Sequence, residues 1–206
     1  MKRVAVFVLS SLLILFIFGC KEQATDLPET NEKAHITQEQ ADNLRQTLIL
    51  VVTVLKEDQP FYSASSKADM RISDYHRNIW QFASVDLDSD DKNEIAVMFE
   101  DGSILILTKE GNSVIGFDFD LHAMYQINRD GSYMWNANAG NTYGSSTLRF
   151  SDNAYETVEL WRVEHDDAGA VTYYVDDKTV SQEVFQTASA KNSQESVTWT
   201  LWADFQ

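Results

Sequence analysis

From Ile79 onward, apolar and polar residues alternate, and turn signals interrupt the alternation about every 8–12 residues. A period of two is that of a half-buried β-strand, whose successive side chains point to opposite faces. Asp101-Gly102 and Asp130-Gly131 stand between such runs, and dipeptides of this kind close tight hairpins. Strands joined by short turns pair with their neighbours in sequence. The pattern therefore predicts an antiparallel meander.

The alternation predicts strands at residues 80–85, 95–99, 104–108, 113–119, 125–128, 132–136, 147–150, 155–165, 171–175 and 197–202. Ser181 is a favourable N-cap residue, so we expect a short helix near the C-terminus, ending at about Ala190. Residues 61–78 are ambiguous, and Ser63, Ser65 and Ser66 favour a loop. We predict an α+β, β-rich fold in which one antiparallel meander sheet is partly covered by an N-terminal amphipathic helix and by this later helix.

The N-terminal helix is expected to begin at Thr37. Thr37 and Gln40 form a capping box, and Ile36 and Ala41 are placed for a hydrophobic staple. The apolar stripe that follows recurs at helical spacing: Ala41, Leu44, Leu48, Val51, Val52 and Leu55. We expect this stripe to pack on the sheet, and the alternative is an amphipathic helix that binds a partner.

The first 20 residues have the order of a secretory signal. Met1-Lys2-Arg3 is basic, residues 4–18 are almost wholly apolar, and Gly19-Cys20 follows directly. Residues 17–20 resemble a lipobox, which predicts lipidation at Cys20 and attachment to the extracytoplasmic face of the cell membrane. An uncleaved anchor and ordinary secretion are the alternatives. We predict a lipoprotein signal peptide at 1–19, a flexible tether at 20–35 and a single β-rich domain at 36–206.

Charge and cysteine content limit the partners and the means of stabilisation. The formal net charge is −16, and it becomes −18 once Lys2 and Arg3 are removed with the signal. Such an acidic surface argues against nucleic acid or anionic lipid as the principal partner. Cys20 is the only cysteine, so the exported domain must depend on its hydrophobic core.

The stretch 86–94 carries the strongest functional signal. Its alternating carboxylates stand at relative positions 1, 3, 5 and 9, and they are Asp86, Asp88, Asp90 and Glu94. So many carboxylates in one turn repel each other, and a hard cation with oxygen ligands removes that repulsion. Lys92, at position 7, is placed to add its carbonyl oxygen. We predict one calcium ion here, with a solvated acidic hairpin or another divalent ion as the alternatives.

The spacing distinguishes between two kinds of calcium loop. An EF-hand requires Gly at position 6 and Glu at position 12, where this chain has Asp91 and Val97. The stretch instead resembles the strand–loop–strand calcium loop of FG-GAP and VCBS-type repeats, which place an acidic residue at position 9. Those repeats usually carry Gly where Asp91 stands. The chain has one copy and is too short for a propeller, so the resemblance covers the loop alone.

A wider resemblance covers most of the mature chain. The acidic loop is followed by Glu-Ile-Ala-Val, by Asp-Gly-Ser, by Arg-Asp-Gly-Ser-Tyr-x-Trp and by a terminal Val-Thr-Trp. This order resembles a group of uncharacterised lipoproteins and exported proteins of Gram-positive bacteria. The resemblance implies export and one compact domain, and it implies no particular activity.

Two further groups of residues are candidate sites. Asp118, Asp120 and His122 alternate with apolar residues, so an extended strand would place all three on one face. Such a face fits a metal or acid–base site, or the wet side of a half-buried strand. The aromatic and amide residues Tyr133, Trp135, Asn138 and Tyr143 form the second candidate, as a platform for a sugar or peptide. The alternative is that these aromatics belong to the core.

The sequence contains no Gly-x-Ser-x-Gly, no His-Glu-x-x-His and no phosphate-binding glycine loop. We therefore expect a non-enzymatic cell-envelope lipoprotein that binds an envelope protein or glycan and is stabilised by one calcium loop. A carboxylate-based envelope hydrolase using Asp118 and Asp120 is the alternative, and convergence of these groups in a concave pocket would favour it. A purely structural or inhibitory surface protein is the third possibility.

Overall fold

The computed structural model describes Arg45 and residues 47–151, 153–192 and 195–205. All of them belong to the second of the two units into which the chain divides, Ile36–Gln206. Cys20, the tether and the capping box at Thr37 and Gln40 lie outside the described residues, so these interpretations remain predictions. Among the residues described, no helix combines the length and apolar composition needed to cross a membrane.

The first sheet has seven strands in the order β13-β3-β4-β5-β6-β1-β2. Its centre is the meander β3 (Ile79–Val85), β4 (Glu94–Phe99), β5 (Ile104–Glu110) and β6 (Ser113–Phe119), with antiparallel pairing throughout. These four strands confirm the predicted alternation. The short strands β1 (Phe61–Ser63) and β2 (Ala68–Met70) lie beyond β6, and β13 (Thr200–Leu201) lies beyond β3.

The second sheet has six antiparallel strands in sequence order. They are β7 (Gln126–Ile127), β8 (Tyr133–Ala137), β9 (Thr142–Ser151), β10 (Ala154–His165), β11 (Val171–Val175) and β12 (Lys178–Val180). A single turn of 3₁₀ helix, η3 (Asn138–Gly140), connects β8 to β9. The longest hairpin pairs β9 with β10 and contains one bulge, between Glu159 and Trp161.

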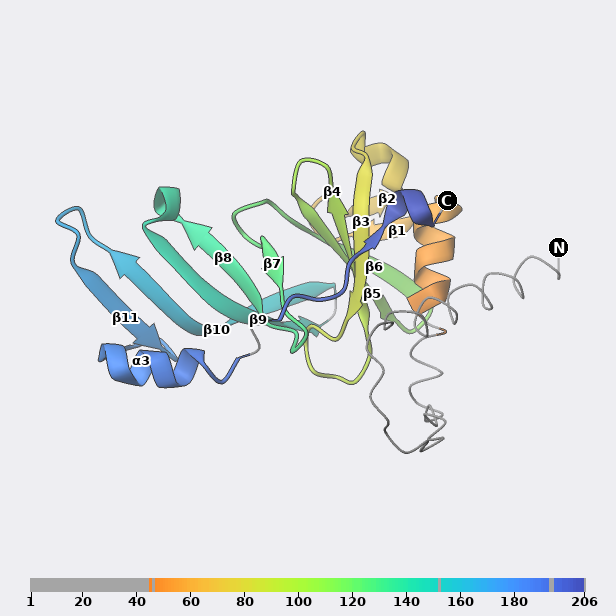
Figure 1. The fold of residues 1–206 in the computed structure, drawn as a ribbon. Helices are drawn as coiled ribbons and strands as arrows, with labels where there is room; N and C mark the ends of the chain where they lie inside the picture. The colour runs from red at the N-terminus through yellow and green to blue at the C-terminus, as the bar shows by residue number, and fades with distance from the viewer. Residues whose placement is uncertain (1–44, 46, 152, 193–194, 206) are drawn as a thin grey trace, which may run out of the picture. The chain divides into compact units, whose positions relative to one another are not determined.

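The prediction of one antiparallel sheet is wrong in two respects: there are two sheets, and β1 runs parallel to β6. The physical reason is that the first sheet is apolar on both faces. In β4 and β5 almost every residue is buried, whichever face it points to. A sheet of this kind needs cover on each side. In Figure 1 the second sheet lies on one side of β3–β6 and the N-terminal helix on the other.

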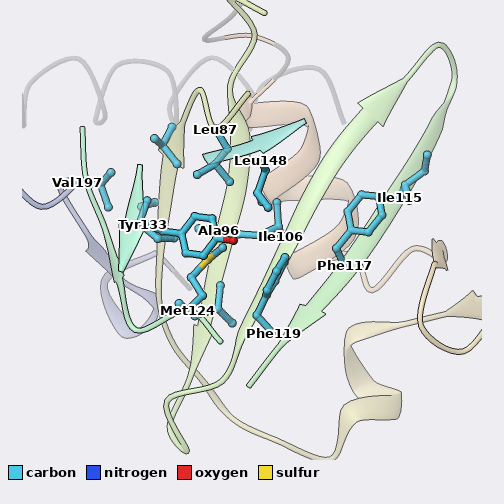
Figure 2. Close-up of a cluster of buried hydrophobic side chains, with 14 residues drawn as sticks. Leu87, Ala96, Ile106, Ile115, Phe117, Phe119, Met124, Tyr133, Leu148 and Val197 are labelled. Atoms are coloured by element: carbon cyan, nitrogen blue, oxygen red, sulfur yellow. The ribbon is translucent and has the colours of Figure 1, made fainter. Parts of the chain in front are cut away.

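The core between the two sheets joins residues that are distant in sequence. Ile106 and Phe117 of the first sheet are buried with Tyr133 and Leu148 of the second, each at most 3% exposed. Figure 2 shows these side chains converging from both sheets. Phe117 also stacks on Phe150, with ring centroids 5.1 Å apart. The core therefore fixes the position of the first part of the second sheet on the first.

The opposite face of the first sheet is covered by the N-terminal helix, whose described part ends in a π-helical segment, η1 (Val51–Lys56). Its buried side chains are Leu50, Val51, Val54 and Leu55. The predicted stripe is correct for Val51 and Leu55, but Leu48 and Val52 are only half-buried. The π-helical turn is wider than an α-helical one, so the buried face is rotated from the position that a period of 3.6 predicts.

The remaining elements include one confirmed and two missed predictions. The helix α3 (Gln182–Ser189) begins as expected, because the Ser181 hydroxyl accepts the Val184 N–H at 3.4 Å. Its Phe185 packs edge-on against Trp161 of the second sheet.

Residues 61–78 are not a loop, since they form β1, β2 and the 3₁₀ helix η2 (Ile72–Tyr75). Strand β12 was also not predicted. Three-residue strands are too short to show a period. A further 3₁₀ turn, η4 (Trp202–Asp204), follows β13.

Candidate metal centre

The acidic stretch forms a strand–loop–strand hairpin, as its resemblance implies. Val85 at the end of β3 pairs with Glu94 at the start of β4, so the turn comprises residues 86–93. Asp86 organises this turn, because its carboxylate accepts the backbone N–H groups of Ser89 at 2.7 Å, Asp90 at 3.2 Å and Asp91 at 3.1 Å. Asp91 has a φ of +65°, a left-handed conformation that glycine adopts most readily, and the loops that this stretch resembles usually carry glycine there. Aspartate tolerates this conformation better than most residues.

The second sheet anchors the loop. Leu87 is fully buried between the sheets, and its carbonyl accepts the Leu148 N–H at 3.4 Å. Gly131, in the β7–β8 turn, lies against the loop backbone with a φ of +79°. A Cβ atom at Gly131 would come within 2.3 Å of the Asp86 carbonyl oxygen. Packing therefore holds the loop backbone in place from the side opposite to its solvent-exposed tip.

Three of the predicted ligands come together. Carboxylate oxygens of Asp86, Asp88 and Glu94 all lie within 4.8 Å of one another. Asp90 is not part of this group: its carboxylate accepts the Lys92 backbone N–H at 2.9 Å and pairs with the Lys92 ammonium. The predicted role of Lys92 concerned its carbonyl, whereas its side chain neutralises Asp90 at the exposed rim.

Glu94 is the most constrained member of the group. It is 3% exposed, and its Oε2 accepts the Leu87 N–H at 2.9 Å. The Thr108 hydroxyl donates to Oε1 from β5 at 3.3 Å. Burial, aided by the negative charges of Asp88, Asp90 and Asp86, raises the pKa of Glu94 to about 8. The folded chain therefore holds an acidic group that is protonated at neutral pH unless a cation compensates its charge.

Asp88 connects this buried group to solvent. Partial burial is the largest cause that raises the pKa of Asp88 above its ordinary value, and the charge of Asp90 is the next. Asp88 and Asp90 also line a hollow of about 460 Å³, whose opposite wall is the β5–β6 hairpin from Thr108 to Gly111. This hollow gives a small ion access to Asp88, and through it to Glu94.

The arrangement could hold a hard cation. It supplies only oxygen ligands, from two half-buried carboxylates and one buried carboxylate. Calcium accepts six to eight oxygens and tolerates irregular geometry, so waters entering from the hollow can complete its shell. Thr108, which orients Glu94, is a supporting residue that the spacing analysis missed, because it stands 14 positions away on another strand.

The predicted aromatic platform is divided between the two faces of its sheet. Trp135 pairs with Gly144 across β8 and β9, whereas Tyr143 precedes Gly144 and points to the opposite face. Tyr133 is 3% exposed and belongs to the core, which is the alternative that its strand position left open. Asn138 is exposed and donates to the Thr142 hydroxyl at 3.1 Å. Trp135 is half-buried against the core, and its indole N–H donates to the Ser146 hydroxyl at 2.9 Å. Of the four predicted residues, Asn138 is therefore the exposed one.

Asp118, Asp120 and His122 are also separated. Strand β6 ends at Phe119, so Asp120 begins a turn, and its Oδ1 accepts the N–H groups of His122 and Ala123, each at 2.8 Å. The His122 ring is exposed and bonds Asn136 at 2.9 Å. Asp118 and Asp120, however, both line a cavity of about 460 Å³ at the end of the first sheet remote from the acidic loop.

We call this cavity the Tyr75 pocket, and its principal wall residues are Met70, Tyr75, Arg77, Phe99, Asp118 and Leu121. Asp101 and Ser103 of the β4–β5 turn also line it. Sequence analysis missed the pocket because Tyr75 and Arg77 lie in a segment expected to be a loop. The sequence did contain one signal of an ordered turn at this pocket, because the Asp-Gly-Ser sequence that closes β4–β5 also closes β7–β8. In each turn the aspartate accepts both the amide and the hydroxyl of the serine.

No family model, characterised protein or solved structure matches the chain.

Proposed function

We propose that the chain is a cell-envelope lipoprotein whose β-rich domain binds one calcium ion in the loop 86–94 and acts by binding an envelope protein or glycan. The observation that carries the calcium proposal is the convergence of Asp86, Asp88 and Glu94 within 4.8 Å around a buried carboxylate. The preformed turn and the resemblance to FG-GAP and VCBS-type loops support it. The export signal and the lipobox-like residues 17–20 support the location.

Calcium is expected to stabilise the fold, because the same loop is packed against both sheets. For a dissociation constant of about 0.1–1 mM, typical of extracellular modules, 1 mM calcium adds roughly 0.4–1.4 kcal/mol to the free energy of unfolding. The corresponding rise in melting temperature is about 1–5 °C. Magnesium should stabilise less, because it dehydrates reluctantly and requires a stricter octahedron.

The test is thermal melting of the wild type and of Asp88→Asn, each with calcium and with a chelator at matched ionic strength. Asp88→Asn keeps the shape of the side chain and removes one charge, so the calcium response should shrink while the metal-free variant melts no lower than the wild type. Asp167→Asn, in the exposed β10–β11 turn, makes the same charge change away from the loop. Equal calcium shifts in all three proteins would indicate general screening of an acidic surface and would exclude the site.

A carboxylate-based hydrolase is a second candidate, and one observation favours it: Asp118 and Asp120 share the Tyr75 pocket. Hydrolysis by two carboxyl groups requires one of them to stay protonated near neutral pH. Asp120 does not fit that role, because hydrogen bonds from the Ala123 and His122 amides lower its pKa. Turnover of chromogenic glycosides or esters that disappears in Asp118→Asn would establish the hydrolase, and its absence across both substrate classes would leave the binding function.

A further inference from the structure

The Tyr75 pocket has the size and composition of a ligand site. Its volume of about 460 Å³ falls in the range of small-molecule pockets. It forms where β2 and η2 fold beside the ends of β4, β5 and β6, so its walls come from three separate segments of the chain, within residues 63–77, 99–104 and 118–121. It lies at the opposite end of β4 from the acidic loop, and no residue of that loop lines it.

Much of the wall is apolar. Phe99 is stacked on Tyr75 with ring centroids 5.4 Å apart, and Met70 adds a flexible thioether. Leu121 is 47% exposed, although its side chain folds over Gly102. One of its methyl groups would lie 2.8 Å from a Cβ atom built at Gly102. An exposed leucine at the mouth of a cavity gains burial when an alkyl group enters. The apolar wall therefore favours a ligand with a hydrocarbon portion.

The charged groups of the pocket leave a negative excess. The one cation among the wall residues is Arg77, whose Nε pairs with Asp101 at 3.3 Å and whose guanidinium also donates to the Ser103 hydroxyl at 2.7 Å. Arg77 and Asp101 thus neutralise each other, and the charges of Asp118 and Asp120 remain. Both hydrogen bonds that the Asp120 carboxylate accepts use Oδ1, so Oδ2 keeps its lone pairs for another donor.

The hydroxyl groups of the pocket add acceptors. The Tyr75 hydroxyl is shielded from solvent, and among the described residues no group meets it in full hydrogen-bonding geometry, although the Asp118 carboxylate and the Ser63 hydroxyl lie beside it. Burial, with the nearby Asp118 carboxylate, raises its pKa, so the phenol stays neutral. Ser63, Ser65 and Ser66 line the same cavity. A ligand that neutralises the two carboxylates and fills these acceptors must carry a positive charge and several N–H donors.

We propose that the Tyr75 pocket binds an organic ammonium group on an alkyl or sugar framework, with Asp118 and Asp120 as its counter-ions. A primary ammonium supplies three N–H donors and one charge, and the apolar wall accommodates the carbon framework. A bare metal ion fits less well, because within the described ranges only Asp86, Asp88 and Glu94 bring three carboxylates within 4.8 Å. An anionic ligand is disfavoured because Arg77 is already paired.

The same ammonium chemistry could come from a free amine, an amino sugar or a lysine side chain, so the probes separate these sources. They are 1,5-diaminopentane, glucosamine and Nα-acetyl-lysine methylamide, and the neutral counterparts are 1,5-pentanediol, N-acetylglucosamine and Nα-acetyl-norleucine methylamide. The purified full chain, in mild detergent and with ¹³C-labelled methyl groups, is titrated with each. The methyl groups of Met70 and Leu121 report on the pocket, and Val184, 51% exposed on α3, is the reference.

At least one ammonium probe should give saturable shifts at Met70 and Leu121 but not at Val184, with at least tenfold weaker binding of its neutral counterpart. Asp118→Asn should weaken binding about tenfold, as expected for the loss of a close counter-ion. Tyr75→Phe keeps the ring stack and removes only the hydroxyl, so it should give a smaller loss. Asp167→Asn carries the same charge change in an exposed turn and should bind within twofold of the wild type.

Three results would overturn the proposal. They are saturable binding of the neutral counterparts with equal affinity, equal effects of Asp118→Asn and Asp167→Asn, and no shift at the pocket methyls for any ammonium probe. The methyl spectrum of each variant is recorded before titration and compared with that of the wild type, to test whether the variant is folded. If Asp118→Asn is not folded, Tyr75→Phe gives an independent reading. Calcium binding is measured separately at the loop, so failure of either site leaves the other unaffected.

Discussion

Replacing Glu94 by glutamine should remove the part of the pH dependence of the metal-free fold that Glu94 causes, and it should weaken the response to calcium. Glutamine has nearly the shape of protonated glutamic acid, and its carbonyl can still accept the Leu87 N–H. It cannot ionise, however, and it cannot supply a charged ligand. The substitution therefore separates the charge of Glu94 from its packing, in a side chain that is 3% exposed.

The expected magnitude follows from the pKa of Glu94, which is about 8 in the folded chain against an ordinary value of 4.5. Below pH 4.5 both the folded and the unfolded chain bind the proton, and no penalty arises. Between 4.5 and about 8 the unfolded chain has released the proton and the folded chain has kept it, so stability falls as pH rises. At about 1.4 kcal/mol per pH unit, the metal-free wild type loses on the order of 3–5 kcal/mol across this window.

Calcium must displace the same proton, because it binds the carboxylate. At a pKa of about 8, binding releases about 0.9 proton at pH 7, about 0.5 at pH 8 and about 0.1 at pH 9. The apparent calcium affinity should therefore rise about tenfold from pH 7 to pH 9. Glu94→Gln should bind calcium weakly at every pH and release almost no proton.

The assay has two parts. Isothermal titration of calcium in buffers of different ionisation enthalpy gives the number of protons released, and urea unfolding in chelator at several pH values gives the stability. Glu156→Gln, which makes the same chemical change at an exposed position on β10, is the matched control and should behave as the wild type. Calcium binding at pH 7 without proton release would refute the reasoning. So would a metal-free stability that depends on pH equally in Glu94→Gln and the wild type.

Three further outcomes are expected. Leu50→Ala opens a cavity under the N-terminal helix and should cost about 2–5 kcal/mol, whereas Ile49→Ala, at a side chain 51% exposed, should change the melting temperature little; equal melting of both would contradict the helix packing. Gly131→Ala should cost about 1–3 kcal/mol more than Gly140→Ala in urea unfolding. Both glycines have positive φ, but only at Gly131 would an added Cβ atom collide with the backbone of the acidic loop. Equal losses of unfolding free energy would show that this contact does not contribute to stability. Cys20→Ala should abolish incorporation of a labelled fatty acid, and equal labelling of the variant would refute the lipobox interpretation.

Local patterns in the sequence predicted the central strands well. The alternation of apolar residues placed β3 to β6, β10, β11 and the second half of β9, because each strand's period is contained in a few consecutive residues. The first half of β9, from Thr142, was not predicted. The spacing of carboxylates likewise predicted the turn at 86–94, since Asp86 binds backbone amides within five residues of itself. Ser181 as the N-cap of α3 is a third feature of this local kind.

Features that depend on contacts between distant residues were decided by the tertiary structure alone. Glu94 has its raised pKa because the folded domain buries it, beside the charges of Asp88, Asp90 and Asp86. Nothing in the spacing of the loop distinguishes it from the exposed Asp90. Tyr75 meets Asp118 only because β1 runs parallel to β6 and carries the following residues to that edge of the sheet. Periodicity states which face of a strand is apolar. Which element covers that face is set by packing across the whole domain, and that packing divided one expected sheet into two.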